Sequence, residues 1–332
     1  MDQQQKTKRF GFFIILCACI LRLSMTGIPG RLLRYLVQAG ISSILTYSET
    51  GQDVRFSASL EKKMDFMRES PMPWMPEPEK PQFSGLDAKL VEMDNDCTYR
   101  PDLETLIAQP LDWDLTAENP AVLILHTHTT ESYTKTTEDY TETSAYRTLE
   151  ERYNMLSVGD AVAEFLRENG IGVIHDREIH DYPSYSGSYV HSRNEAEEIL
   201  ARYPSIRLVL DLHRDAVERN GVQLRTLAEV DGAPSAQLMI VVGTDVSRQS
   251  HKNWQENLAL ALKLQVQMER LCPGIMRPMN LRPQRFNQDL SPGALLIEVG
   301  AAGNTHAEAL AAAGVLAQTI ADLAKGANTE AS

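Results

Sequence analysis

Buried strand patterns alternate with amphipathic helix patterns from about residue 116 to the end of the chain, and this alternation restricts the fold more than any other feature. The first strand is the continuous apolar run Ala121–Leu125, as expected for a strand that is buried on both faces. Further strands are predicted at 172–174, 207–212, 238–242 and 294–299, and helices at 154–167, 195–203, 253–271 and 305–323. The order predicts an α/β fold, a three-layer α/β/α sandwich with a mostly parallel central sheet. Thr305 is the expected N-cap of the last helix.

The first 28 residues resemble a membrane-targeting segment. Lys6, Lys8 and Arg9 precede an apolar run from Phe10 to Leu21, which predicts a signal anchor, with a cleaved signal or a buried helix as alternatives. The positive flank would leave the N-terminus in the cytoplasm and the rest of the chain outside. We therefore expect a single-pass protein of the cell membrane, with its folded part on the extracytoplasmic side.

Residues 29–115 are expected to separate this anchor from the folded domain. The segment 30–47 predicts an amphipathic helix near the membrane, or an ordinary packed helix. Five prolines between residues 71 and 81 predict a stiff, extended tether. The sequence thus predicts three parts: an anchor over 1–28, a juxtamembrane helix and tether over 29–115, and a folded catalytic domain over 116–326.

Composition excludes several classes of function. The net charge of −13 leaves little cationic surface for nucleic acid, so we expect no nucleic-acid partner. The four cysteines form no CxxC pair, which argues against a cysteine zinc site, an iron–sulfur cluster and a dense disulfide framework. The sequence also lacks the GxSxG, HExxH, Walker A and GxGxxG motifs.

Imidazoles and carboxylates follow or interrupt three of the predicted strands. His126, His128 and Glu131 follow the first strand, His213 ends the third, and Glu298 lies inside the last, between apolar neighbours. Ligands of such sheets collect at the carboxyl ends of the strands. Imidazole and carboxylate are zinc ligands, and a nearby free carboxylate can shuttle a proton, so the pattern indicates a zinc hydrolase. The alternatives are hydrogen-bonded loop histidines and a structural ion pair at Glu298.

Two further features near these strand ends bear on substrate binding. Arg214 could bind substrate carboxylates through two hydrogen bonds, or form an ion pair with Asp215. The polar and aromatic segment 184–189 could line a groove for a sugar or a peptide, or be an ordinary loop.

Eight segments in order resemble the stage II sporulation protein P family over about residues 119–323: 125–133, 153–155, 173–176, 180–185, 211–216, 242–245, 287–294 and 298–304. The resemblance implies a hydrolase of the cell wall of spore-forming bacteria, which thins septal peptidoglycan during engulfment. It also implies a distant relationship to zinc-dependent N-acetylmuramoyl-L-alanine amidases, with a further endopeptidase activity on stem peptides. The implied partners are peptidoglycan and the sporulation proteins D and M, in a membrane-held complex.

The resemblance also implies roles for individual residues. In the wider amidase family, zinc is held by a histidine after the first strand, an acid four residues before a helical asparagine, and a histidine after a later strand. These positions correspond to His128, Glu150 and His213, and Glu298 corresponds to the catalytic carboxylate. The first strand here lacks the glycine-rich turn of that family, which leaves His126 and Glu131 as rival ligands. The alternative function is a catalytically inactive wall-binding scaffold that recruits other engulfment proteins, and a zinc peptidase for other peptides is a weaker third.

Overall fold

The computed structural model describes residues 81–327, apart from residues 112, 114, 116–117, 137–139 and 248–249. All of them belong to one compact unit, Glu77–Ser332. The signal anchor predicted over 1–28 lies outside the described residues, as do the juxtamembrane helix and the proline-rich part of the tether.

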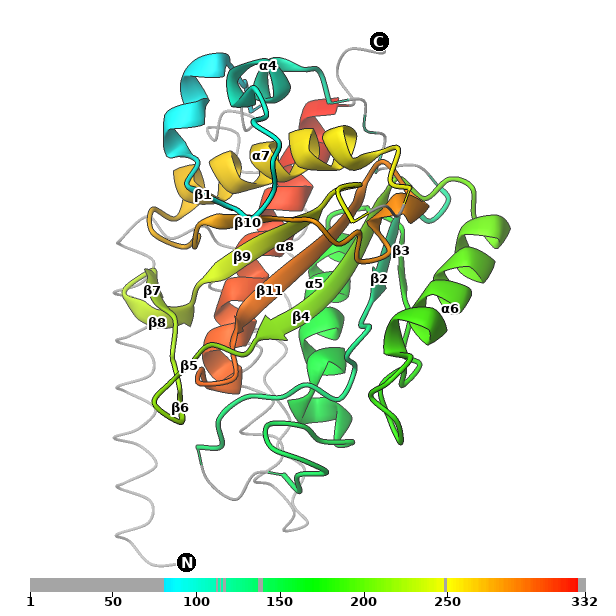
Figure 1. The fold of residues 1–332 in the computed structure, drawn as a ribbon, viewed down its shortest axis with the longest axis vertical. Coiled ribbons are helices and arrows are strands. Elements are labelled where there is room, and N and C mark those ends of the chain that lie inside the picture. The colour runs from blue at the N-terminus through cyan, green and yellow to red at the C-terminus, as the bar shows by residue number, and fades with distance from the viewer. Residues whose placement is uncertain are drawn as a thin grey trace, which may run out of the picture. The chain divides into compact units, whose positions relative to one another are not determined.

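A seven-stranded sheet forms the centre of the described part of the chain (Figure 1). In spatial order its strands are β1 (Met93–Asn95), β10 (Met279–Arg282), β9 (Leu238–Gly243), β11 (Ala294–Ala301), β4 (Leu208–Asp215), β2 (Val122–Leu125) and β3 (Val173–His175). Neighbouring strands are parallel except β9 and β11, which are antiparallel. The predicted α/β fold with a mostly parallel sheet is confirmed.

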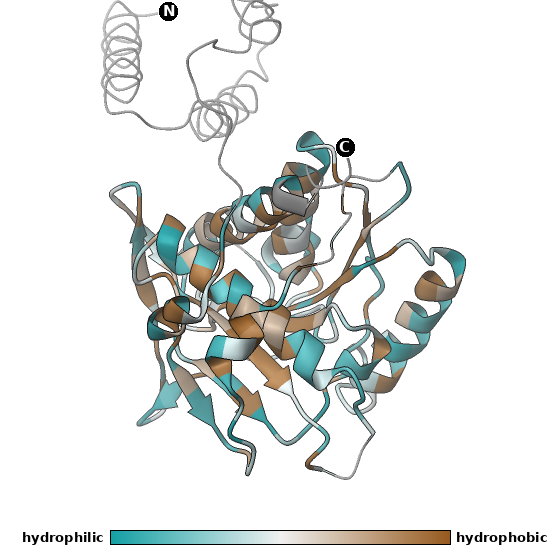
Figure 2. Ribbon diagram, turned by 90° about the horizontal axis from the view of Figure 1, so that it is seen from above, coloured by the Kyte–Doolittle hydropathy of each residue, from teal (hydrophilic) through white to brown (hydrophobic). Residues whose placement is uncertain are grey.

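Helices cover both faces of this sheet. The helices α5 (Met155–Glu168), α7 (Trp254–Leu271) and α8 (His306–Ala327) pack on one face, and α6 (Ser188–Arg202) packs on the other. Figure 1 shows α5 and α8 behind the sheet and α6 beside β2 and β3. The apolar residues of β2 alternate accordingly, since Val122 and Ile124 join the larger core and Leu123 and Leu125 pack against α6. Figure 2 shows hydrophobic residues both on central strands and on parts of the helices.

The helix ends follow from local sequence. Asn154 caps α5, because its side chain accepts a hydrogen bond from the backbone N–H of Leu156 at 3.0 Å. The expected N-cap at Thr305 is confirmed: Thr305 and Glu308 form a reciprocal capping box at the start of α8. By length and composition, His306–Lys325 is one helix among the described residues that could cross a membrane, but 67% of its apolar window is buried inside the fold.

The folded unit begins upstream of the predicted boundary at residue 116. The 3₁₀ helix η1 (Gly85–Leu90), strand β1 and helix α4 (Leu103–Ala108) belong to it. β1 pairs with β10, and α4 packs against α7, where Lys263 donates a hydrogen bond to the carbonyl of Leu106 at 3.1 Å. These elements are too short to give the periodic apolar patterns from which the other elements were predicted.

Four short strands lie between β4 and β9 in the chain and form two hairpins. One joins β5 (Glu218–Arg219) to β6 (Val222–Gln223), and the other joins β7 (Leu227–Val230) to β8 (Ala233–Ala236). Two further 3₁₀ helices, η2 (Glu151–Tyr153) and η3 (Gln288–Leu290), lie before α5 and before β11. The side chain of Asn304 binds the backbone of Thr226 and thereby ties the second hairpin to the start of α8.

Candidate active site

His213 and Glu298 lie next to each other because of the register between β4 and β11. Leu210 and Leu212 of β4 point into the larger core, so Asp211 and His213 point to the opposite face. His213 is the register partner of Glu298 in the parallel pair β4 and β11. Side chains of register partners lie on the same side of a sheet, so the imidazole and the carboxyl group share one face at the carboxyl end of the sheet.

Asp211 holds both the turn after β2 and the ring of His213. Its carboxylate accepts hydrogen bonds from the backbone N–H and the hydroxyl of Thr127, at 2.8 and 2.6 Å. It also lies 2.9 Å from Nε2 of His213, an ion-pair distance at which the N–H is not aligned for a hydrogen bond. Burial would raise the pKa of Asp211, but the His213 ring and the Thr127 hydrogen bonds outweigh it and lower the pKa. Asp211 therefore remains a carboxylate that orients His213.

The rings of His128 and His213 meet edge to face, with centroids 5.2 Å apart, and both side chains are buried. Burial lowers the pKa of His128 to about 4, so this ring is neutral at physiological pH. Burial would also lower the pKa of His213, but Asp211, Glu131 and Glu298 raise it to about 9. Without a bound cation, His213 is thus protonated and balances the surrounding carboxylates.

Glu131 is a second carboxylate beside this pair of histidines, in addition to Asp211. Its Oε2 atom lies 3.7 Å from Nδ1 of His213, and its Oε1 atom lies 3.1 and 3.5 Å from the guanidinium groups of Arg147 and Arg214. Burial would raise the pKa of Glu131, but Arg214, the two histidines and Arg147 lower it. Glu131 is therefore ionised although it is buried.

Glu298 has the opposite protonation state. The residue is partly buried, and its Oε2 atom is enclosed without a hydrogen-bond partner. Burial raises the pKa of Glu298 to about 8, although the nearby His213 opposes this shift. Glu298 consequently holds a proton at neutral pH and is poised to exchange it near the pH at which a general acid or base works best.

Aromatic and hydroxyl side chains surround His128. The hydroxyl of Tyr185 lies 2.9 Å from Nε2 of His128, and the hydroxyl of Ser188 lies 3.3 Å from Nδ1. Tyr189 contacts both histidine rings, with centroids 5.6 Å from His128 and 6.5 Å from His213. All three residues belong to the polar and aromatic segment 184–189, but their contacts with the histidines could not be predicted from the sequence.

His126 lies apart from this cluster, although it was a rival ligand. Its Nδ1 atom contacts the carbonyl of Leu212 at 3.0 Å, and its Nε2 atom lies 2.8 Å from Nε2 of His175. His175 in turn contacts Asp160 of α5 at 3.0 Å. His126 thus points toward the α5 side of the sheet, because side chains alternate along the extended chain after β2.

Glu150 is not brought to the histidines either. Its Oε1 atom accepts a hydrogen bond from the backbone N–H of Thr141 at 2.8 Å, and its Oε2 atom lies 3.5 Å from Arg152. These contacts hold Glu150 to its own loop, just before η2. Of the two acids considered from the sequence, Glu131 is the one that lies beside His213.

Arg214 is buried and is bonded to other groups of the protein. Its side chain donates to the carbonyls of Ser132 and Tyr146, both at 2.9 Å, and its backbone N–H donates to Glu131 at 3.2 Å. Only 6% of the residue is exposed. Asp215, the alternative partner of Arg214, forms an ion pair with Arg277 at 2.7 Å. These contacts occupy the guanidinium of Arg214, and its role as a substrate ligand stays a prediction.

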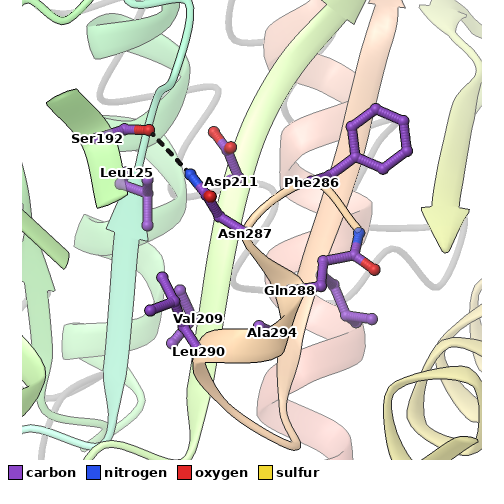
Figure 3. A pocket seen from close by; sticks show the side chains of 10 residues that line it. Leu125, Ser192, Val209, Asp211, Phe286, Asn287, Gln288, Leu290 and Ala294 are labelled. Atoms are coloured by element: carbon purple, nitrogen blue, oxygen red, sulfur yellow. Dashed lines mark hydrogen bonds between the residues drawn. The ribbon is translucent and has the colours of Figure 1, made fainter. Parts of the chain in front are cut away.

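A small cleft lies beside Asp211 on the same face of the sheet (Figure 3). Asn287 closes one side of the cleft, because its amide donates to the carbonyl of Tyr189 at 2.8 Å and to the hydroxyl of Ser192 at 3.4 Å. Phe286 and Asn287 both adopt left-handed backbone conformations, with φ of 49° and 59°. This turn places Phe286 against Tyr189 and so connects the cleft to the histidine pair.

The donor atoms of His128, His213 and Glu131 fit a zinc ion in kind. Zinc takes nitrogen and oxygen ligands, and two donors on a tetrahedral ion are about 3.3 Å apart for bonds of about 2.0–2.1 Å. Nδ1 of His213 and Oε2 of Glu131 are 3.7 Å apart, and Asp211 contacts the other nitrogen of the same ring, as carboxylates do behind metal-bound histidines. Within the described ranges, no group of three or more such side chains already has the spacing of a formed metal site. Binding would therefore require these side chains to move.

Comparison with known proteins gives a family. The family model of stage II sporulation protein P matches residues 47–321. A protein with the same name from Bacillus subtilis (strain 168) is 28% identical over 219 residues, which are 63% of this chain and 52% of the relative. The chain thus matches about half the length of this curated relative.

Solved structures of N-acetylmuramoyl-L-alanine amidases are also similar. AmiC2 of Nostoc punctiforme matches 63% of this chain and 96% of its own, with 14% identity and a TM-score of 0.35. Ami1 of Mycobacterium smegmatis matches 62% and 97%, with 10% identity and a TM-score of 0.37. CwlD of Clostridioides difficile, solved in complex with the GerS lipoprotein, matches 60% and 96%, with 14% identity and a TM-score of 0.35. Similarity at this level carries no argument about the site.

Proposed function

Because the chain belongs to the stage II sporulation protein P family, we propose that it is a zinc-dependent peptidoglycan hydrolase of the N-acetylmuramoyl-L-alanine amidase type. The observation that carries the proposal is the register pair of His213 and Glu298 beside the ionised Glu131. At neutral pH Glu131 is ionised and Glu298 holds a proton. Such a pair of carboxyl groups suits metal binding together with general acid–base catalysis.

His128, His213 and Glu131 would hold the zinc ion. When bound, zinc would supply a Lewis acid for the scissile carbonyl and would lower the pKa of a water molecule to about 7. We prefer Glu131 to Glu150 as the acidic ligand because Glu131 lies 3.7 Å from His213, whereas Glu150 is held by Thr141 and Arg152. Arg147 and Arg214 would keep Glu131 ionised and in place.

Glu298 would move the proton. In the reacting form it accepts a proton from the attacking water and then delivers it to the nitrogen of the leaving amine, so that the C–N bond of the amide breaks with a neutral amine as product. Its pKa of about 8 lies close to the working pH, which favours both transfers. Asp211 lies 2.9 Å from Nε2 of His213 and would keep Nδ1 of the same ring facing Glu131.

The biological setting follows from the family and is part of the proposal. The substrate would be septal peptidoglycan that is thinned during engulfment, and the bond would be the amide between the lactyl group and L-alanine, with stem-peptide cross-links as a second target. The N-terminal segment would anchor the chain in the cell membrane, with the catalytic domain outside. The sporulation proteins D and M would be its partners there.

Digestion of purified peptidoglycan sacculi tests the proposal. The full chain with zinc should release stem peptides, detected by chromatography and mass spectrometry, and a chelator should stop the release. Glu298→Gln should abolish release while leaving the zinc content unchanged, and Glu218→Gln, at an exposed position on β5, serves as the matched control. Release by Glu298→Gln at the wild-type rate would contradict the role of Glu298. A wild-type chain that binds sacculi and releases nothing would instead identify an inactive wall-binding scaffold.

A further inference from the structure

A loop of six exposed and uncharged residues lies beside the candidate active site. It runs from Tyr182 to Gly187, between β3 and α6, and contains only tyrosine, proline, serine and glycine. The loop thus carries no charge, in a chain of which 23% of the residues are charged and whose net charge is −13. We refer to these six residues as the 182–187 loop.

The loop is exposed but firmly held at both ends. Asp181, directly before it, is buried and accepts hydrogen bonds from the hydroxyl of Thr130 at 2.8 Å and from Arg147 at 2.5 Å. Ser188, directly after it, is buried at the start of α6, and its N–H donates to the carbonyl of Tyr185 at 3.3 Å. A loop fixed in this way loses little conformational entropy when a ligand binds to it.

Tyr185 connects the loop to the candidate active site. Its ring is stacked on the ring of His128, with centroids 4.4 Å apart and an interplanar angle of 15°, and the guanidinium of Arg147 lies 4.8 Å from its centroid. In spite of both contacts, 57% of Tyr185 remains exposed, and Tyr182 is 48% exposed. The loop therefore presents two tyrosine rings to solvent, and one of them, Tyr185, contacts the proposed zinc ligand His128.

The charge of this surface favours the glycan strand of peptidoglycan over its stem peptides. Stem peptides are acidic and would need a cation, but Arg147, the cation that contacts Tyr185, is already bound to Glu131 and Asp181. In the glycan strand the lactyl carboxyl group is bound as the amide, so the strand carries no charge at the bond to be cut. Apolar faces of pyranose rings can stack on tyrosine rings, and their hydroxyl and acetamido groups can bond to serine and tyrosine hydroxyls.

We propose that the 182–187 loop binds the uncharged glycan strand of peptidoglycan, with Tyr182 and Tyr185 as stacking surfaces. Bound there, the strand passes directly beside His128, which brings the amide on its muramic acid to the candidate active site. The inference rests on the function proposed above for its choice of substrate, but it concerns binding and requires neither zinc nor hydrolysis.

Binding of chitohexaose, an uncharged hexamer of N-acetylglucosamine, to the zinc-free full chain tests the inference by calorimetry or NMR titration. Tyr182→Ala and Tyr185→Ala should each weaken binding by about three- to tenfold, the range expected for loss of one stacking contact, and the double variant should weaken it further. Val222→Ala, which shortens a 64% exposed side chain on β6, is the matched control and should bind like the wild type. Co-sedimentation with intact sacculi should give the same order of affinities, and near-UV circular dichroism verifies that each variant is folded.

Three results would overturn the inference. The double variant could bind chitohexaose as tightly as the wild type does, the wild type could bind neither glycan probe, or the substitutions could weaken binding only of the acidic peptide L-alanyl-D-glutamate. Because these measurements exclude zinc and hydrolysis, loop-dependent glycan binding by a chain that cleaves nothing would contradict the proposed function and leave this inference standing.

Discussion

Replacement of Glu298 by glutamine should change the way in which stability depends on pH. In the folded chain the carboxyl group keeps its proton up to about pH 8, whereas in the unfolded chain it ionises near its ordinary value of 4.5. Between these values the unfolded chain binds fewer protons than the folded chain does, so the free energy of unfolding falls as the pH rises. Below pH 4.5 this contribution to stability is fully present, and above pH 8 it is lost.

The size of the effect follows from the pKa of Glu298. Each pKa unit corresponds to about 1.4 kcal/mol, so the span from pH 5 to pH 8 sets a ceiling of about 4 kcal/mol. We expect about half of this ceiling, about 2 kcal/mol, because the residue is only partly buried and water weakens the effect. Glutamine has nearly the same shape and cannot ionise, so Glu298→Gln should become more stable than the wild type by this amount as the pH is raised.

Denaturant unfolding of the zinc-free chain at several values between pH 5 and pH 8 measures the difference. Tryptophan fluorescence is a suitable probe because Trp113 and Trp254 are both buried in the fold. Glu218→Gln should give a profile parallel to that of the wild type, since this carboxylate is exposed on β5. Parallel profiles for the wild type and Glu298→Gln would refute the conclusion that Glu298 is protonated in the folded chain.

Three other substitutions test the packing of the fold. Burial lowers the pKa of Lys263 from 10.5 to about 8. The free energy of unfolding of the wild type should therefore rise between pH 8 and pH 10.5. Urea unfolding of Lys263→Met should show no such rise. Burial would raise the pKa of Glu308, but its bonds to Arg225 and to the α8 terminus lower it to about 2. In the same assay, Glu308→Gln should lower the free energy of unfolding by about 1–2 kcal/mol at pH 7. The loss should become progressively smaller from pH 4.5 toward pH 2. A Cβ atom on Gly159 would lie 2.4 and 2.5 Å from two histidine nitrogens, so Gly159→Ala should lower stability by about 1–3 kcal/mol, whereas Gly314→Ala, with open space in α8, should not. Equal melting temperatures for these two alanine variants would contradict the close packing at Gly159.

The strands that carry the site could be predicted because their sequences are short apolar runs. His213 and Glu298 could be predicted as site residues for the same reason. A titratable side chain inside or directly after an apolar run must be desolvated or have a charged partner nearby. The predicted β4 and β11 agree with the structure to within a few residues at each end. Parallel pairing then brings the two residues together without any information beyond the strand pattern.

Other elements could not be predicted because their sequences lack a periodic signal. The strands β1 and β10 have three and four residues and mix polar with apolar side chains, so nothing marks them as part of the sheet. The first half of α6 is mostly polar, and the predicted helix at 195–203 therefore began seven residues too late, since α6 begins at Ser188. Pairing with β9 stabilises β10, and pairing with β10 stabilises β1, whereas α6 is stabilised by packing against β2 and β4. A local sequence pattern does not contain these contributions.

The sequence alone could not decide whether Glu131 or Glu150 lies beside the histidines, because tertiary packing decides it. Glu131 and Glu150 both lie outside the predicted strands and helices, so no periodic pattern distinguishes them. Glu131 lies beside His213 because Arg147 and Arg214, from distant parts of the chain, hold its carboxylate there. The same packing occupies the guanidinium of Arg214, and the local sequence around this residue does not show those contacts.

Anomalous scattering at the zinc absorption edge, from crystals of the full chain grown with zinc, tests the central claim most directly. The account predicts one strong peak within bonding distance of His128, His213 and Glu131, with the carboxyl group of Glu298 next to it. A peak bound by Glu150, a peak between His126 and His175, or no peak at these histidines would contradict the proposed metal centre.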